Sequence, residues 1–521
     1  MATVIRLPDD PNFEQLRKQA KDLRERAGSG APDALALIAA HQPTGPHPPS
    51  LAGAQLAVAR RYGFPSWAAL KRHVHTIQRH RRTPDRIDSA TSPADRFLLL
   101  ACLRYSPDDN PERWTQAAAL LATHPHLTAT SIHAAAAAAD TAALTTLLTD
   151  DPTLAVTEGG PFAWEPLLYL AYARHDPAVP EDAVAETARL LLHHGADPNA
   201  GYLWHGLTTP FTALAGALGG GEHGQPPHPA ADVLATALLT AGADPNDGQA
   251  LYNRQFGTDD THLRLLIDHG LGRDDGRDDG REARRGDGRG DRRGAGRRSN
   301  PWRTRLGTAI PSPADLIADQ LWWAVTHDLP DRVRLLAECA DLHAPFHFPD
   351  HRPVRLRAWN GTTPTRLAAQ CGSTRVLRYL AVHGAPWSPA DGADSLVAAA
   401  LAGERATVQR LRPHADAARR RRPALIVWAA ARSVWHAVPL LVELGFDVNA
   451  RGRGDIPLEQ PWETALHQAA AADDLTGAHL LIGLGADPNI RDTRFDDTPL
   501  GWAEHLRHTQ VAHYLRPLTD R

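Results

Sequence analysis

The stretch that decides the fold reads Thr464-Ala465-Leu466-His467-Gln468-Ala469, and it is followed by Leu480-Leu481-Ile482 and then by Gly485-Ala486-Asp487-Pro488-Asn489. A second copy opens 34 residues later at Thr498-Pro499-Leu500. Threonine caps a helix, alanine lets helices approach closely, and the leucine-rich segment supplies bulk for a second helix. The repeat predicts a stack of small helical modules, each burying its apolar face only against its neighbours.

The six-residue pattern, here called the hexad, occurs eleven times in the 521-residue chain. Its sixth residue is alanine in every copy except one, which has Arg254. The copies begin at Arg96, Thr130, Pro166, Thr212, Gln249, Asp319, Thr363, Asp394, Ala424, Thr464 and Thr498. Four glycines, at 195, 242, 445 and 485, each precede an asparagine by four residues. Such a glycine is expected to end the second helix in a left-handed conformation that leads into a tight turn.

These features resemble bacterial ankyrin-repeat proteins, and the segment Gly242-Ala243-Asp244-Pro245-Asn246-Asp247-Gly248-Gln249-Ala250-Leu251-Tyr252-Asn253 is typical of an actinobacterial subgroup. The resemblance covers about residues 96–518. It implies an all-α fold, an ankyrin-repeat solenoid of stacked helix-turn-helix units with projecting finger loops, whose concave face binds other proteins. The family's histidine at the fourth hexad position remains only at His133 and His467, so stitching by histidine is expected at few places.

Four segments are predicted along the chain. Residues 1–90 form a small helical N-terminal region of four helices, with a cap at Ser66, and we interpret it as a cap over the first repeat. Residues 91–270 and 301–521 are two blocks of repeats. Residues 271–300 are rich in Gly, Arg and Asp, a composition that cannot bury a core and therefore predicts a disordered insertion.

Composition and motifs limit the classes of function that we expect for this chain. The chain has 56 Lys and Arg against 60 Asp and Glu, so its net charge of -4 supplies no general attraction to nucleic acid or anionic membranes. Three scattered cysteines, no secretion signal and no long apolar run indicate a cytoplasmic protein without a membrane partner. We find no motif for catalytic residues, a cofactor or a metal, and we expect a non-enzymatic protein.

Two other functions stay open at this stage. One is an enzyme whose site is assembled from residues distant along the chain. The other is nucleic-acid binding through the basic runs at residues 71–82 and 419–422, although a solvated helix face explains either run and we do not expect a nucleic-acid partner. The leading prediction is recognition of a protein partner by the concave face and the finger loops. The sequence indicates neither the partner nor the oligomeric state.

Candidate partner-binding residues lie in the fingers, just before four of the hexads. Tryptophans at these places are candidate anchors, because interfaces concentrate binding energy in aromatic and arginine side chains, and packing between fingers is the alternative. The tryptophans and the polar residues beside two of them are Trp164, Trp204, His205, Trp359, Asn360 and Trp462.

A second candidate group is Tyr252, Asn253 and Arg254, at the end of one weak hexad copy. Arginine here replaces the alanine of the other copies. A long cation in a tight position between helices needs a carboxylate or carbonyl partner. If the hexad is aligned correctly, these three residues mark a specialised patch.

Overall fold

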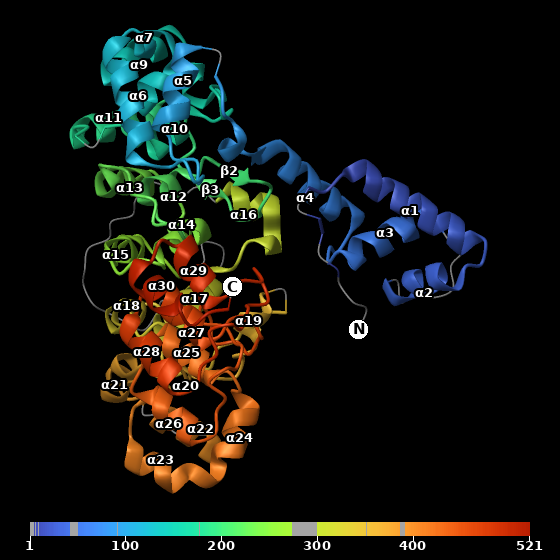
Figure 1. Cartoon of the computed structure of the whole chain (residues 1–521). Coiled ribbons are helices and arrows are strands. Elements are labelled where there is room, and N and C mark those ends of the chain that lie inside the picture. The colour runs from blue at the N-terminus through green and yellow to red at the C-terminus, as the bar shows by residue number, and fades with distance from the viewer. Residues whose placement is uncertain are drawn as a thin grey trace. The chain divides into compact units, whose positions relative to one another are not determined.

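The computed structural model describes residues 5, 7–8, 10–41, 50–90, 92–176, 178–273, 300–350, 352–385 and 391–520. These residues are predominantly helical, and their three short strands form one small sheet (Figure 1). The chain divides into two compact units, unit 1 (Met1–Leu316) and unit 2 (Ile317–Arg521). The predicted disordered insertion at 271–300 falls mostly on residues outside the described ones.

Four helices open unit 1, as predicted: α1 (Phe13–Gly28), α2 (Pro32–His41), α3 (Leu51–Arg61) and α4 (Trp67–His80). Ser66 caps α4, since its hydroxyl accepts a hydrogen bond from the Ala69 N–H at 3.2 Å. Farther along, Ile77 of α4 packs in a small core with residues of β2 (Gly201–Trp204) and α16 (Pro301–Leu306). The region predicted as a cap is therefore attached through β2 and α16.

Helix pairs follow in unit 1. The first helices of the pairs are α5 (Pro93–Ala101), α8 (Ile132–Ala137), α10 (Pro166–Tyr172), α12 (Ala213–Leu218) and α14 (Gly248–Arg254), and they pack on one another in that order. The second helices are α6 (Pro111–Thr123), α9 (Thr141–Asp150), α11 (Glu181–His193), α13 (Ala231–Thr240) and α15 (Thr261–Asp268). Every residue of α10 and α12 is buried, so the first helices form the core of unit 1.

Shorter elements join these helices. They are α7 (Leu127–Thr130), the 3-10 turns η1 (Pro84–Arg86), η2 (Pro152–Val156) and η4 (Gly307–Ala309), and the strands β1 (Arg81–Arg82), β2 and β3 (Phe211–Thr212). Strand β1 pairs in parallel with β2, and β2 pairs antiparallel with β3. The sheet ties the end of α4 to the finger that precedes α12.

Unit 2 continues with helix pairs. Its first helices are α17 (Pro313–Thr326), which crosses the boundary between the units, α20 (Pro364–Cys371), α22 (Gly392–Leu401), α25 (Leu425–Ala431), α27 (Ala465–Ala471) and α29 (Pro499–His505). Its second helices are α18 (Pro330–Leu336), α21 (Thr374–Val382), α23 (Arg405–Leu411), α26 (Ala437–Glu443), α28 (Leu475–Gly483) and α30 (Thr509–Leu515). Short helices α19 (Val354–Arg357), η5 (Arg412–His414) and α24 (Ala415–Arg421) lie between pairs.

The predicted helical hexads are confirmed, because all eleven overlap a helix. Helices α20 and α22 pack together, and so do α25, α27 and α29 in succession. Most of these helices are only seven or eight residues long, too short to be stable alone, so their stability comes from contact with neighbouring pairs. No helix among the described residues has the length and apolar character that crossing a membrane requires.

Asparagine side chains join successive helix pairs. The glycines at 195, 242, 445 and 485 have φ between 83° and 103°, as predicted for left-handed helix ends. In unit 1, Asn199 Nδ2 donates to the Gly242 carbonyl at 3.1 Å, and its Oδ1 accepts from the Asp244 N–H at 2.9 Å. In unit 2, Asn449 makes the same two bonds one module apart, to residues 485 and 487. The turn of one module is therefore tied to the turn of the next.

Histidine side chains join a finger to a helix at the two hexads that keep this residue. His467 is fully buried, its Nδ1 contacts the Thr464 hydroxyl at 2.8 Å, and its Nε2 lies 3.1 Å from the Asp497 carbonyl oxygen. His133 Nε2 lies 2.9 Å from the Thr157 carbonyl oxygen. Burial lowers the pKa of both imidazoles, so they are neutral at pH 7 and each fixes a finger to a helix.

Replacing His467→Ala should therefore destabilise unit 2. The change removes the contacts of the imidazole with Thr464 and with the Asp497 carbonyl, which keeps only its bond from the Asp492 N–H, at a cost of about 1–3 kcal/mol. Urea unfolding followed by circular dichroism measures this loss. His505→Ala is the control, because His505 is exposed and its loss should change the unfolding free energy by less than about 0.5 kcal/mol. Equal effects of the two substitutions would contradict the role given to His467.

Candidate functional site

Two finger loops lie side by side in unit 2, at residues 446–463 and 486–497, just before α27 and α29. The Thr493 N–H donates to the Trp462 carbonyl at 3.0 Å. The Thr493 hydroxyl donates to the Pro461 carbonyl at 2.7 Å. These bonds hold the second finger against the end of the first and bring side chains of both fingers together.

Alternating cationic and aromatic side chains run across the two fingers. The Arg453 guanidinium lies 4.9 Å from the ring centroid of Trp462, and the Arg494 guanidinium lies 4.5 Å from it. Arg494 also lies 5.0 Å from the ring centroid of Phe495. We call Arg453, Trp462, Arg494 and Phe495 the finger ladder. Phe495 is 61% exposed, so the ladder ends in an aromatic ring that is open to solvent.

A buried carboxylate holds the exposed end of the ladder in place. Asp492 Oδ1 accepts from the N–H groups of Arg494 at 2.7 Å and Phe495 at 2.6 Å, and its Oδ2 accepts from Trp502 Nε1 at 3.0 Å. Burial alone would raise the pKa of Asp492, but the hydrogen bonds from Phe495, Trp502, Arg494 and Asp497 outweigh it and lower the pKa. The ionised carboxylate therefore fixes the turn that presents Phe495.

The other end of the ladder is also fixed. Arg453 Nε donates to Asp455 Oδ1 at 2.7 Å, and its Nη1 donates to Gln460 Oε1 at 3.1 Å. The guanidinium is thus held over Trp462 from within the same finger. Side chains ordered before binding lose less conformational entropy when a partner arrives, so the ladder is suited to recognition.

A glutamate follows the tryptophan in this finger, where it is buried, and in one other, where it is half-buried. Glu463 is 2% exposed, and its Oε1 accepts from the Gly454 N–H at 2.7 Å and from Gln468 Nε2 at 2.9 Å. Burial raises the pKa of Glu463 to about 7. Glu165 follows Trp164 in the same way, and burial, followed by the nearby Asp197, raises its pKa to about 7. Both carboxyl groups therefore titrate near neutral pH, because burial disfavours their charged form.

Charged side chains of α20, α22 and α24 in unit 2 pair with one another. Asp394 of α22 is 1% exposed and accepts hydrogen bonds from Arg366 Nε at 3.0 Å, Gln370 Nε2 at 2.8 Å and Arg421 Nη1 at 2.5 Å. These pairs join α20, α22 and α24. Because these charges are already paired within the protein, they are less available to bind a partner. The finger ladder is therefore the stronger candidate site.

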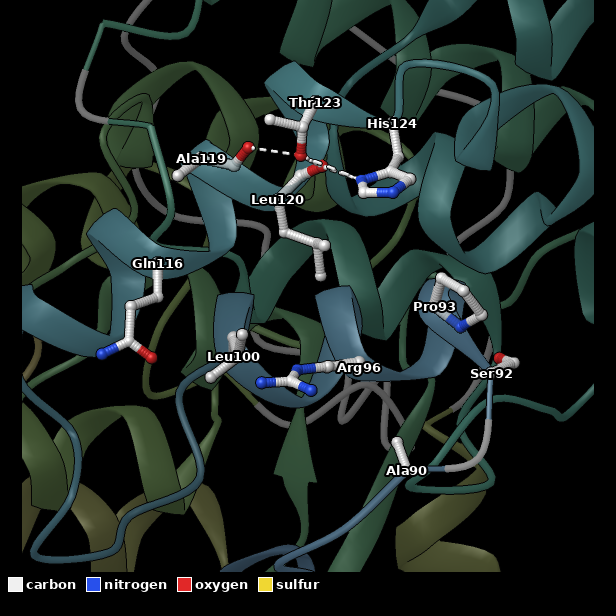
Figure 2. A pocket seen from close by; sticks show the side chains of 10 residues that line it. All are labelled: Ala90, Ser92, Pro93, Arg96, Leu100, Gln116, Ala119, Leu120, Thr123 and His124. Carbon is white, nitrogen blue, oxygen red and sulfur yellow. Dashed lines mark hydrogen bonds between the residues drawn. The ribbon is translucent and has the colours of Figure 1, made fainter.

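An open groove lies between α5 and α6 in unit 1. It has a volume of about 580 Å³, and Figure 2 shows the side chain of Arg96 beneath Leu120, with Thr123 and His124 at the far side. The hydroxyl of Ser92 is engaged in capping α5, where it accepts from the Asp95 N–H at 3.0 Å. The ten residues that line the groove include no carboxylate or thiol, and His124 is their one titratable group near neutral pH.

The structure separates the four predicted tryptophans. Trp164 is 1% exposed and lies within 5 Å of the Tyr202 ring, and Trp359 is 8% exposed. For these two, burial contradicts the exposed anchor, and for Trp164 the contact with Tyr202 supports packing between fingers. Trp204 and Trp462 are half-buried. Only Trp462 belongs to the finger ladder, where its ring is covered by two guanidinium groups.

The polar residues predicted beside the tryptophans have structural partners. His205 Nε2 lies 2.7 Å from Asp85 Oδ1, which ties the finger before α12 to η1. Asn360 bridges the backbone of Phe348, because its Oδ1 accepts from the Phe348 N–H at 2.7 Å and its Nδ2 donates to the Phe348 carbonyl at 3.0 Å. Both side chains stabilise loops.

The second predicted group, at the end of α14, is only partly accessible. Tyr252 is 36% exposed, and its hydroxyl donates to Glu222 Oε1 at 2.5 Å. Asn253 is 3% exposed, which rules it out as a contact for a partner in this conformation. Arg254 has the carboxylate partner that the sequence required, since its Nη2 lies 2.7 Å from Asp259 Oδ2. It lies at the end of the helix, and its side chain is 15% exposed.

Three members of the ladder, Arg453, Arg494 and Phe495, were not predicted from the sequence. Phe495 occurs 33 residues after Trp462, one residue short of the 34-residue offset between their hexads. A search for any aromatic residue near one period, in place of tryptophan alone, would have found it. No sequence pattern marks the two arginines, because arginine is abundant throughout the chain.

The stability of unit 2 should depend on the titration of Glu463. Its folded pKa of about 7 lies above the ordinary value of 4.5, so the folded state binds the proton more tightly and loses stability as the pH rises from about 4.5 through 7. Glu463→Gln should therefore raise the melting temperature more at pH 8 than at pH 5. The exposed Glu404→Gln serves as control, and equal shifts for Glu463→Gln at both pH values would refute the assignment.

A comparison with protein families matches residues 462–493 to the family described as Ankyrin repeat. A comparison with curated proteins finds no match to the chain. The matched residues comprise Trp462, the pair α27 and α28, the turn with Asn489, and the start of the second finger. They coincide with the clearest copy of the repeat in the sequence. The chain therefore contains a segment, residues 462–493, that is similar to an ankyrin repeat.

Proposed function

We propose that the chain is a cytoplasmic, non-enzymatic recognition protein of bacterial type, in which about eleven ankyrin-like repeats present finger loops and a concave face to a protein partner. Ankyrin repeats are modules of protein–protein interaction, and stacked repeats create extended binding surfaces. The matched repeat at 462–493 and the overlap of all eleven hexads with helices support this proposal.

The finger ladder is the observation that carries the proposal. Tryptophan and arginine are the residues most enriched at the energetic centres of protein interfaces. The ladder combines them on two adjacent fingers, and it adds Phe495, a large apolar side chain that is 61% exposed. Exposure of this ring costs hydrophobic free energy that a partner would recover by covering it.

The chemistry of the ladder favours binding over catalysis. Guanidinium, indole and phenyl groups neither donate nor accept protons readily near neutral pH. The carboxyl that titrates there, Glu463, is 2% exposed and hydrogen-bonded from within the finger. We therefore propose a partner surface with an apolar pocket for Phe495 and a carboxylate that meets Arg494 across the interface.

Truncating the exposed end of the ladder should weaken capture of the partner. We expect the double variant Arg494→Ala/Phe495→Ala to lose about 2 kcal/mol or more of binding free energy, about 30-fold in Kd. Partners captured by the immobilised wild-type protein are identified by mass spectrometry, and their affinities are then measured by interferometry. The control is Val382→Ala, which truncates an apolar side chain that is 77% exposed on α21. If both variants bind the captured partner as tightly as wild type, the finger ladder is not its site.

A further inference from the structure

Helix α4 presents a cationic face to solvent. Its exposed polar residues Lys71, Arg72, His75, Gln78 and Arg79 fall within an arc of about 120° at 3.6 residues per turn. The opposite side is buried and packs in the cores of unit 1. The face spans eight residue steps, about 12 Å along the helix axis.

The sequence around this helix excludes acidic residues. Residues 34–84 contain seven Lys and Arg but no Asp or Glu, although the whole chain has 60 acidic residues. Residues 1–90 hold 14 Lys and Arg against 8 Asp and Glu, a net charge of +6, which leaves -10 for the rest of the chain. The near-neutral net charge of the whole chain therefore does not reveal that residues 1–90 are basic and the remaining residues acidic. At physiological salt charges are screened beyond about 8 Å, so a ligand at α4 responds mainly to the local charge.

The cations at the two ends of α4 differ in their partners. Arg79 and Arg82 bind Glu158 at 2.8 and 3.2 Å, and these pairs anchor the end of the helix. Lys71 and Arg72 are exposed and form no ion pair with any described residue, although the Lys71 ammonium lies 5.8 Å from the ring centroid of Phe13. The start of the helix therefore carries charge that no ion pair among the described residues neutralises.

Two nearby histidines have lowered pKa values, to which burial contributes most and arginines of this region contribute next. The pKa of His80 is lowered to about 4, first by burial and then by Arg305, Arg79 and Arg82. Burial and then Arg61 and Arg60, at the end of α3, lower the pKa of the partly enclosed His41. Arg60 and Arg61 lie just before the turn that leads into α4, and both are exposed. The charge of this region thus comes from both helices.

We propose that the exposed face of α4, with the end of α3, binds the phosphate backbone of a nucleic acid through Lys71 and Arg72. An anionic membrane fits less well, because membrane-surface helices bury large apolar side chains, and α3 and α4 expose none among their described residues. Charge complementarity and the hydrogen-bond donors of His75 and Gln78 suit phosphate and base edges. The surface is separate from the finger ladder and does not depend on it.

Fluorescence anisotropy of the full chain with a labelled 20-base-pair DNA duplex tests the proposal. Wild type should bind at 50 mM NaCl and weaken steeply with salt. Lys71→Ala/Arg72→Ala should reduce the slope of log K against log salt by about 1.8, which corresponds to two phosphate contacts at about 0.9 each. A 20-nucleotide single strand is the second arm, where two contacts correspond to about 1.4. The arm with the tighter binding identifies the form that is recognised.

The matched control is Arg410→Ala/Arg412→Ala, which removes two exposed arginines from α23 and η5 in unit 2 and should leave the slope unchanged. Circular dichroism of each variant verifies that it is folded. Three results would overturn the proposal: no binding of either nucleic acid at 50 mM NaCl, equal slopes for wild type and the α4 variant, or binding to poly-glutamate or phosphatidylglycerol vesicles as tight as to nucleic acid.

Discussion

The structure depends on side chains of one module that bind the backbone of the next. Asn199 and Asn449 each bridge two backbone groups of the following turn, and His467 reaches the carbonyl of the following finger. Helices of seven residues do not form alone, and these bonds fix the register in which they bury one another's apolar faces. The separation and angle of neighbouring fingers follow from that register.

Much of the fold is legible in the sequence because its signals are local. A cap, an alanine and a leucine pair act within one module, and each hexad overlaps a helix. The glycine before Asn199 or Asn449 likewise needs only its own φ, which is positive in the structure. The bonds that these asparagines make to the next module lie about 40 residues away, and spacing alone gives no sign of them.

The candidate site was less predictable, because exposure is decided by distant residues. Trp164 and Trp462 occupy the same place before a hexad and are both followed by glutamate. Trp164 is covered because Tyr202, from another finger, lies against its ring. Trp462 instead meets Arg453 and Arg494. Equivalent positions in a repeat therefore serve packing in one unit and surface chemistry in the other.

Arg494 is shared by two aromatic rings, so the energetic contribution of each side chain cannot be measured by substituting that side chain alone. Its guanidinium contacts both Trp462 and Phe495, so removing either ring changes the surroundings of the cation that serves the other. Energies of single substitutions here should not sum to that of the combined change, because contacting residues show coupling of 0.5–3 kcal/mol in general. The three side chains act as one cooperative unit, and only a thermodynamic cycle over pairs of them would apportion its energy.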